Sequence, residues 1–183
     1  PAFDDIGGQS LRFDHDIYTL SSLASYQKRN AALALESAKL LGINIHTDLT
    51  KQALHNASWA GRFEVMGKQP MTIVDGAHNE EGMRALIASF PCLPRPLTVV
   101  FSALKDKPGQ AMAELLQANC DRLIITQFTN ARADTVEGLS IPHAETISSW
   151  QEAVDTARRE TNPDGSVVIT GSLYFVSLVR AYL

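Results

Sequence analysis

Four short apolar runs, each followed by a helical pattern, constrain the fold of this chain more than any other feature. The runs are MTIV at 71–74, LTVVF at 97–101, RLIIT at 122–126 and SVVIT at 166–170. Their continuous hydrophobicity is typical of strands that are buried on both faces. Helical patterns follow near 80–89, 108–119, 149–160 and 172–182. This alternation predicts an α/β fold, in which helices cover both faces of a Rossmann-like, mostly parallel sheet.

The first third of the chain has a different pattern. Residues 1–18 mix charged, glycine and aromatic residues without a clear period, and we expect loops with one or two short strands there. Helices are expected at 21–41 and near 48–56, where apolar residues recur at helical spacing. The change of pattern near residue 60 predicts two units, a mainly helical one at 1–60 and the α/β one at 61–183.

Charge, hydropathy and cysteine usage exclude several classes of protein. The 183 residues carry a net charge of −4, so the excess of Lys and Arg that a nucleic-acid surface needs is absent. No apolar stretch approaches the ~20 residues that span a bilayer, and the N-terminus lacks signal-peptide features, so no membrane partner is expected. Two isolated cysteines favour a reduced, cytoplasmic protein. The five histidines are scattered without an HxxxH pair, which predicts no zinc site.

Ligands of an open parallel sheet bind beyond the carboxyl ends of its strands, so the residues after each run carry the functional information. Those segments are DGAHN at 75–79, SALKDKP at 102–108, QFTNARA at 127–133 and GSLYF at 171–175. Three of the four are polar, charged or glycine-containing in ways that a plain turn does not need. Binding residues are therefore expected there.

The segment DGAHN has two interpretations. Asp75 can accept hydrogen bonds from two adjacent hydroxyls, as acidic residues at strand ends do for ribose. His78 would lie beside a helix N-terminus, where anions are favoured. In the plainer interpretation, Asp75 and Asn79 only cap turns and His78 is a surface residue. For this segment in isolation the plainer interpretation is favoured.

Three further polar residues each have a functional and a plainer interpretation, and for Lys105 and Asn30 taken alone the plainer one is favoured. Lys105 could hold a carboxylate or phosphate, Ser172 at a helix start could hold a small anion, and Asn30 could read a base edge. The alternatives are a solvated charge run, an ordinary N-cap and an exposed helix residue. The motifs GxGxxG, GxxxxGK[ST] and GxSxG are absent from the sequence, so a complete enzyme is hard to assemble from it.

Five motifs together resemble one family. In order, YQKRNAALAL, GRFE, IVDGAHN, SALKDK and TGSLYF look like the later half of a folylpolyglutamate synthase. That family includes bifunctional dihydrofolate synthases and belongs to the Mur ligase superfamily. The similarity extends from about Leu20 to the end of the chain, and GRFE followed by DGAHN is its most specific part. The segment KDKP replaces the more usual KDKD of the family.

The resemblance implies an activity and its division between two domains. Family members add L-glutamate to a folate or dihydropteroate carboxylate, using ATP and Mg²⁺, through an acyl-phosphate intermediate. Residues 1–60 would be the tail of the ATPase domain, and 61–183 would be the C-terminal Rossmann-like domain. The P-loop and the Mg²⁺ ligands are expected upstream, in the N-terminal ATPase domain of the same parent chain. The chain alone is therefore expected to be inactive.

Carried over position by position, the resemblance implies a set of ATP-binding residues. Asn30 would contact the adenine and Asp75 the ribose hydroxyls. Arg62 would bind the ATP phosphates, a task that suits its planar cationic group. His78, the catalytic candidate, would lie near the γ-phosphate or the acyl phosphate. No metal ligand is assigned within this chain.

The glutamate-binding residues and the family itself are less narrowly defined by the sequence. Lys105 and Ser172 are the candidates for holding the carboxylates of glutamate. Another Mur-superfamily ligase, of the peptidoglycan-precursor or cyanophycin type, remains an alternative, and so does a non-catalytic α/β domain that binds a nucleotide or a protein. The chain begins with Pro1, not Met. A P-loop encoded before Pro1 would favour the enzyme, whereas an initiator Met directly before it would favour the binding module.

Overall fold

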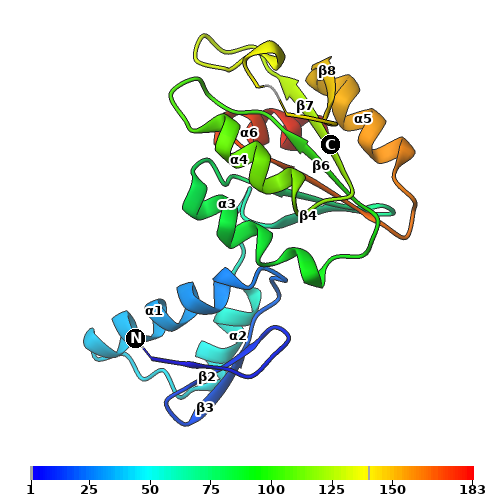
Figure 1. Cartoon of the computed structure of the whole chain (residues 1–183). Helices are drawn as coiled ribbons and strands as arrows, with labels where there is room; N and C mark the ends of the chain where they lie inside the picture. The colour runs from blue at the N-terminus through cyan, green and yellow to red at the C-terminus, as the bar shows by residue number, and fades with distance from the viewer. Residues whose placement is uncertain (1, 140) are drawn as a thin grey trace. The chain divides into compact units, whose positions relative to one another are not determined.

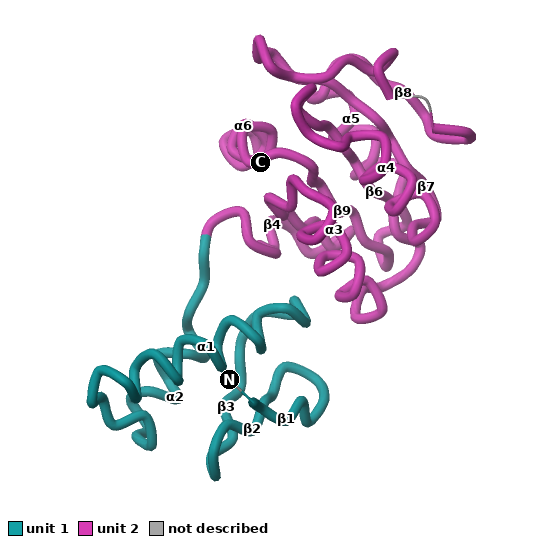
Figure 2. Tube along the Cα trace, turned by 60° about the vertical axis from the view of Figure 1, so that its left-hand side comes forward, with its two compact units in different colours: residues 1–59 teal, residues 60–183 magenta. Residues whose placement is uncertain are grey.

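A computed structural model describes residues 2–139 and 141–183. It divides the chain into two compact units, Pro1–Trp59 and Ala60–Leu183, which Figure 2 distinguishes as teal and magenta. Each unit has a hydrophobic core of its own.

The first unit combines a small antiparallel sheet with two helices (Figure 1). Its elements are β1 (Asp4–Asp5), β2 (Ser10–Phe13), β3 (Asp16–Thr19), α1 (Tyr26–Leu40) and α2 (Asp48–Asn56). The core consists of Leu11, Phe13, Tyr18, Leu20, Ala31, Ala32, Leu35 and Ile45. Three strands are present where one or two were expected. The two residues of β1 are exposed aspartates, so this strand carries no hydrophobic signal in the sequence.

The second unit is built on a six-stranded sheet. Its strands are β4 (Glu64–Lys68), β5 (Met71–Asp75), β6 (Leu97–Phe101), β7 (Arg122–Gln127), β8 (Glu145–Ser149) and β9 (Ser166–Thr170). The order across the sheet is β4-β5-β9-β6-β7-β8, and only β4 runs antiparallel to its neighbour. The four interior strands are the four apolar runs, so the predicted α/β fold with a mostly parallel sheet is confirmed. The edge strand β4 is only partly buried, and it therefore lacks a continuous apolar run.

Helices cover both faces of this sheet (Figure 1). They are α3 (Glu80–Ile87), α4 (Gly109–Gln117), α5 (Trp150–Glu160) and α6 (Leu173–Tyr182), with short 3₁₀ turns at Phe90–Cys92 and Val136–Gly138. Helices α5 and α6 share one core cluster, while α3 and α4 pack against each other on the other face. Right-handed crossovers explain why the helices divide between the two faces. The chain crosses the sheet in one direction from β5 to β7 and returns through α5 to β9. Within the described residues, no helix has the length and apolarity needed to cross a membrane.

The strand register places three chain segments side by side. Thr170 at the end of β9 pairs with Asp75 on β5 and with Phe101 on β6. The segments that follow these three strands therefore leave the same edge of the sheet. Helix α3 leaves β5 toward one face and α6 leaves β9 toward the other, so a topological switch point lies between them. Such points are where α/β sheets bind their ligands.

Candidate functional site

The Asp75 carboxylate links the two most specific sequence motifs. Its Oδ1 accepts the N–H of Ala77 and its Oδ2 accepts the N–H of Phe63, each at 2.9 Å. The N–H of Gly76 donates to the carbonyl oxygen of Gly61 at 2.8 Å. Asp75 is only 2% exposed. The GRFE turn and the DGAHN loop therefore form one hydrogen-bonded substructure at the end of β5.

This substructure presents Arg62 next to the loop. Both neighbours of Arg62, Gly61 and Phe63, are hydrogen-bonded to the Asp75–Gly76 segment. Arg62 itself is half-buried, and its guanidinium has no hydrogen-bond or ion-pair partner within residues 2–139 and 141–183. An unpaired guanidinium in this position is available to bind a phosphate or a carboxylate.

His78 closes the DGAHN loop just before α3. Its Nδ1 lies 2.8 Å from the carbonyl oxygen of Gly76. A carbonyl oxygen only accepts hydrogen bonds, so Nδ1 carries the proton in this contact, and Nε2 remains available to another group. Asn79 caps α3, because its Oδ1 accepts the N–H of Gly82 at 2.8 Å. The plainer interpretation of this segment thus accounts for Asn79 and for the turn, but it leaves Nε2 of His78 without an assigned role.

Two buried serines at neighbouring strand ends have hydroxyl groups without partners. Ser102 directly follows β6 and is 0% exposed, and Ser172 directly precedes α6 and is 1% exposed. In the part of the chain that the structure describes, neither Oγ has a hydrogen-bond partner. Backbone contacts join their segments, because Ser102 donates its N–H to Thr170 at 3.2 Å and Gly171 donates to Ala77 at 3.1 Å. Buried hydroxyls are normally satisfied, so these two indicate a place for a polar ligand or a water.

The start of α6 adds a favourable field at this place. Ser172 occupies the N-cap position, but its side chain makes no capping hydrogen bond. The first N–H groups of a helix have no partner within the helix, and together with the helix dipole they favour an anion. Two free hydroxyls beside such a helix end are suited to hold a carboxylate.

Lys105 lies in a different environment. It lines a groove of about 610 Å³, together with Gln127, Phe128, Thr129, Asn130, Ala131, Ala133, Asp134, Thr135, Ser148, Ser149, Trp150 and Gln151. Its neighbour Asp106 forms an ion pair with Arg132 at 2.7 Å, and this hydrogen bond lowers the pKa of Asp106. No residue from the segments after β5 or β9 is among the lining residues, so this groove does not bring Lys105 together with Ser172.

Asn30 belongs to the first unit. It is exposed on α1, and its Nδ2 donates to Oε1 of Gln27 at 2.9 Å, one helical turn earlier. The group of site residues that the second unit assembles by itself therefore consists of Arg62, Asp75, His78 and Ser172.

Sequence reasoning missed Ser102. The residue was inside the motif SALKDK, but the lysines of that motif carried the more obvious charge. The available signal was its position, since Ser102 is the first residue after a buried strand. The same rule that selected Asp75 would have selected it.

The fold and the site are those of an α/β domain that binds an anionic ligand. Polar and cationic groups gather where β5, β9 and β6 end, which is typical of α/β domains that bind nucleotides or other anions. Residues 61–173 match the family model of the Mur ligase, glutamate ligase domain. The chain therefore belongs to the Mur ligase family.

Two individual proteins that this chain resembles are folylpolyglutamate synthases. Folylpolyglutamate synthase of Lacticaseibacillus casei is 34% identical over 188 residues, which cover 96% of this chain and 44% of that protein. The solved folylpolyglutamate synthase of Mycobacterium tuberculosis, complexed with ADP and AMPPCP, is 26% identical with a TM-score of 0.80, covering 97% of this chain and 46% of that one.

A bifunctional folylpolyglutamate synthase/dihydrofolate synthase from Yersinia pestis, complexed with AMPPNP and a Mn ion, shares the fold. Its TM-score is 0.87 at 22% identity, and the match covers 98% of this chain and 45% of that one. The chain thus spans less than half the length of each of these three proteins.

Proposed function

We propose that this chain is the C-terminal part of an ATP-dependent ligase of the folylpolyglutamate synthase type. The intact enzyme would join L-glutamate to a carboxylate of a folate or of dihydropteroate, forming an amide bond through an acyl phosphate. Membership of the glutamate ligase domain family supports this assignment. The structural observation that carries it is the gathering of Arg62, His78 and the hydroxyls of Ser102 and Ser172 where three strands end.

The ATP-binding roles follow from the chemistry of each group. Arg62 binds the phosphates with its unpaired guanidinium, and His78 offers Nε2 to the γ-phosphate or the acyl phosphate. Asn30, from the first unit, contacts the adenine. Asp75 is the candidate for the ribose hydroxyls, in addition to the two backbone N–H groups from which it accepts hydrogen bonds. Asp75 therefore has two functions in this proposal, to bind ATP and to hold the loop that carries His78.

In this proposal the ligands of the divalent cation belong to another part of the intact enzyme. The site residues described above suit phosphates rather than Mg²⁺, because Mg²⁺ prefers carboxylate and other oxygen ligands and the only carboxylate among them, that of Asp75, is buried. The Mg²⁺ ligands and the P-loop would belong to the N-terminal ATPase domain of the parent. The Mn ion in the Yersinia pestis protein agrees with a need for a divalent cation in the family. Such an ion would neutralise charge on the phosphates.

The glutamate site is assigned to the start of α6. The hydroxyl groups of Ser172 and Ser102 donate hydrogen bonds to one carboxylate of glutamate, and the helix dipole favours the negative charge of that carboxylate. Lys105 is the candidate for the other carboxylate. The amine then attacks the acyl carbon, the C–O bond to phosphate breaks, and one amine proton is released to solvent. This chain thus positions the nucleophile, while the ATPase domain would activate the acceptor.

A synthetase assay tests the proposal. The full-length protein that contains this chain is incubated with ATP, Mg²⁺, L-glutamate and either dihydropteroate or a reduced folate, and the products are analysed by mass spectrometry. We expect a product that is heavier by one glutamyl residue. The isolated 183-residue chain should show no turnover and only millimolar ATP binding by calorimetry. Turnover by the isolated chain, or sub-micromolar ATP binding, would contradict the division of labour between the two domains.

A further inference from the structure

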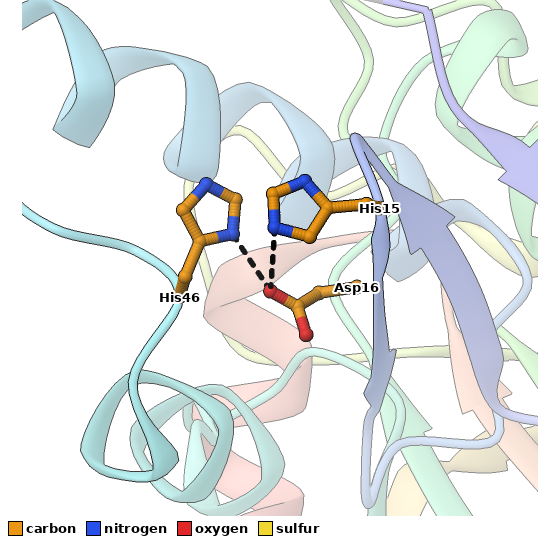
Figure 3. A group of neighbouring side chains, drawn as sticks. All are labelled: His15, Asp16 and His46. Carbon is orange, nitrogen blue, oxygen red and sulfur yellow. Dashed lines mark hydrogen bonds and ion pairs between the residues drawn. The ribbon is translucent and has the colours of Figure 1, made fainter.

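The first unit contains three potential metal ligands to which the ligase chemistry gives no role (Figure 3). His15 lies in the turn between β2 and β3, Asp16 begins β3, and His46 lies in the loop between α1 and α2. Nδ1 of His46 is 2.7 Å and Nε2 of His15 is 3.9 Å from the same oxygen, Oδ2 of Asp16. The expectation of no zinc site used local histidine spacing, which does not detect ligands that lie 30 positions apart.

The backbone on both sides of the cluster is anchored in the core of the unit. Tyr18, on the same strand as Asp16, is fully buried and donates its hydroxyl to the carbonyl oxygen of Ile45 at 3.0 Å. Ile45 is itself buried and directly precedes His46. The N–H of His46 donates to Oδ1 of Asn44 at 3.0 Å. The hairpin and the loop therefore hold the ligands at a defined separation without any ion.

The side chains are oriented toward one point. Lys51 contacts Oδ1 of Asp16 at 2.6 Å, which leaves Oδ2 directed at the two imidazoles. The rings of His15 and His46 are stacked, with centroids 4.2 Å apart and planes at 18°. Each ring directs one nitrogen to the Asp16 carboxylate in Figure 3. The His15 side chain is 77% exposed and that of His46 is 33% exposed, so solvent has access to the cluster.

We propose that His15, Asp16 and His46 form a binding site for a divalent transition-metal ion of the zinc class. Two imidazole nitrogens and one carboxylate oxygen are a ligand set of open zinc sites, in which water takes the fourth position. Tetrahedral bonds of about 2.0–2.2 Å separate ligand atoms by about 3.3–3.6 Å. The observed 2.7 and 3.9 Å lie on either side of that value, and all three ligand atoms are within 4.8 Å of one another. Because an imidazole binds a metal in its ring plane and the two rings are stacked, one ring must also turn about its side-chain torsions, and the largely exposed His15 side chain has room to do so.

The site discriminates between cations. Imidazole is a good ligand for Zn²⁺, Cu²⁺ and Ni²⁺, whereas Mg²⁺ prefers oxygen ligands and keeps its waters. The proposed site is therefore chemically separate from the Mg²⁺ that supports ATP chemistry. A bound ion would connect the β2–β3 turn to the α1–α2 loop. Because it binds the folded chain, it would stabilise the fold by an amount that rises with the logarithm of its concentration once that exceeds Kd.

Calorimetric titration of the 183-residue chain with ZnCl₂ tests the site. We expect saturable binding of one ion per chain, and no comparable binding of MgCl₂. His15→Ala and His46→Ala should each weaken the affinity for Zn²⁺ at least tenfold. The matched control is His143→Asn, since His143 is an exposed histidine of the second unit with φ 64°, a conformation that Asn tolerates. This control should bind Zn²⁺ with unchanged affinity.

Thermal unfolding gives a second readout. ZnCl₂ should raise the melting temperature of the unmutated 183-residue chain and of His143→Asn, but not of His15→Ala. Because His15 is largely exposed, His15→Ala is expected to fold normally, and it decides the question if His46→Ala does not fold. The absence of one-to-one binding would overturn the proposal. So would an affinity for Zn²⁺ that His15→Ala leaves unchanged or that His143→Asn weakens equally.

Discussion

Asp75 accepts the backbone N–H of Phe63 at 2.9 Å, although the two residues are twelve positions apart in the sequence. Phe63 has a φ of 49°, a left-handed conformation that is costly for a residue with a bulky side chain. The buried carboxylate stabilises this turn and, through Ala77, the loop that ends in His78. The sequence offered a ribose contact or a turn cap for Asp75, and the structure shows that its carboxylate holds both the GRFE turn and the DGAHN loop.

The first prediction concerns this structural function. Asp75→Ala should lower the free energy of unfolding by about 2–4 kcal/mol, because two buried N–H groups lose their acceptor. Urea unfolding of the isolated chain measures it. Asp164→Ala is the control, since the side chain of Asp164 has no partner within the described residues, and its effect should stay within about 0.5 kcal/mol. If both variants are equally stable, Asp75 does not organise the loop.

The interior of the sheet could be predicted from the sequence because its signal is local. A strand buried on both faces must be apolar throughout, and the four interior strands are continuous apolar runs. The edge strand β4 has one partly solvated face, so its residues alternate irregularly and it escaped prediction. The strand order could not be inferred either, because β9, the last strand in the sequence, lies between β5 and β6.

The site was predictable only in part, for the same reason. Asp75, His78 and Ser172 were selected because ligands bind beyond strand ends, which is a rule about position in the sequence. The contact between Asp75 and Phe63 depends on tertiary structure, and so do the unpaired hydroxyls. A sequence pattern does not indicate which buried polar group lacks a hydrogen-bond partner. Only the packed structure shows that Ser102 and Ser172 have the same unsatisfied chemistry.

The second prediction concerns the glycine between β9 and α6. Gly171 has a φ of 114°, and a Cβ atom there would lie 2.4 Å from the carbonyl oxygen of Ser102. Backbone strain and overpacking each cost about 1–3 kcal/mol. Gly171→Ala should therefore destabilise the chain by at least about 2 kcal/mol more than Gly42→Ala, where φ is 75° but no atom lies within 4 Å. Equal melting temperatures of the two variants would contradict this account of the β9–α6 junction.

The third prediction is a pH dependence. Arg180 donates two hydrogen bonds to Glu64, at 2.6 and 3.0 Å, and they lower the pKa of Glu64 from its ordinary 4.5. A lowered pKa in the folded state contributes stability that is fully present above 4.5 and is lost as pH falls through the folded value. Arg180→Met should thus be less stable than the parent at pH 7, with a gap that narrows below pH 4.5.

Urea unfolding between pH 7 and pH 3 measures that gap. Arg158→Met is the control, because Arg158 is an exposed arginine of α5 that has no ion pair within the described residues. Its difference from the parent should not change with pH. A gap for Arg180→Met that stays constant down to pH 3 would show that the ion pair with Glu64 is not its cause.

The fourth prediction concerns His78 in the full-length protein. His78→Ala should lower kcat more than it raises KM for ATP, because the proposed contact of Nε2 is with the reacting phosphoryl group. Steady-state kinetics with saturating glutamate measure both constants. An unchanged kcat would remove His78 from the catalytic machinery, and a raised KM alone would make it a binding residue.

The most direct test of the account is the glutamate KM of a Ser102→Ala/Ser172→Ala variant of the full-length protein. Both hydroxyls lack partners in the described chain, so their removal should leave stability unchanged or slightly higher. The matched control is Ser166→Ala, because Ser166 is equally buried and unpartnered but lies at the opposite end of β9. We predict that the double variant raises KM for glutamate at least tenfold, with KM for ATP unchanged, and that Ser166→Ala changes neither. Equal glutamate KM values for the double variant and Ser166→Ala would contradict the assignment of the glutamate site to the start of α6.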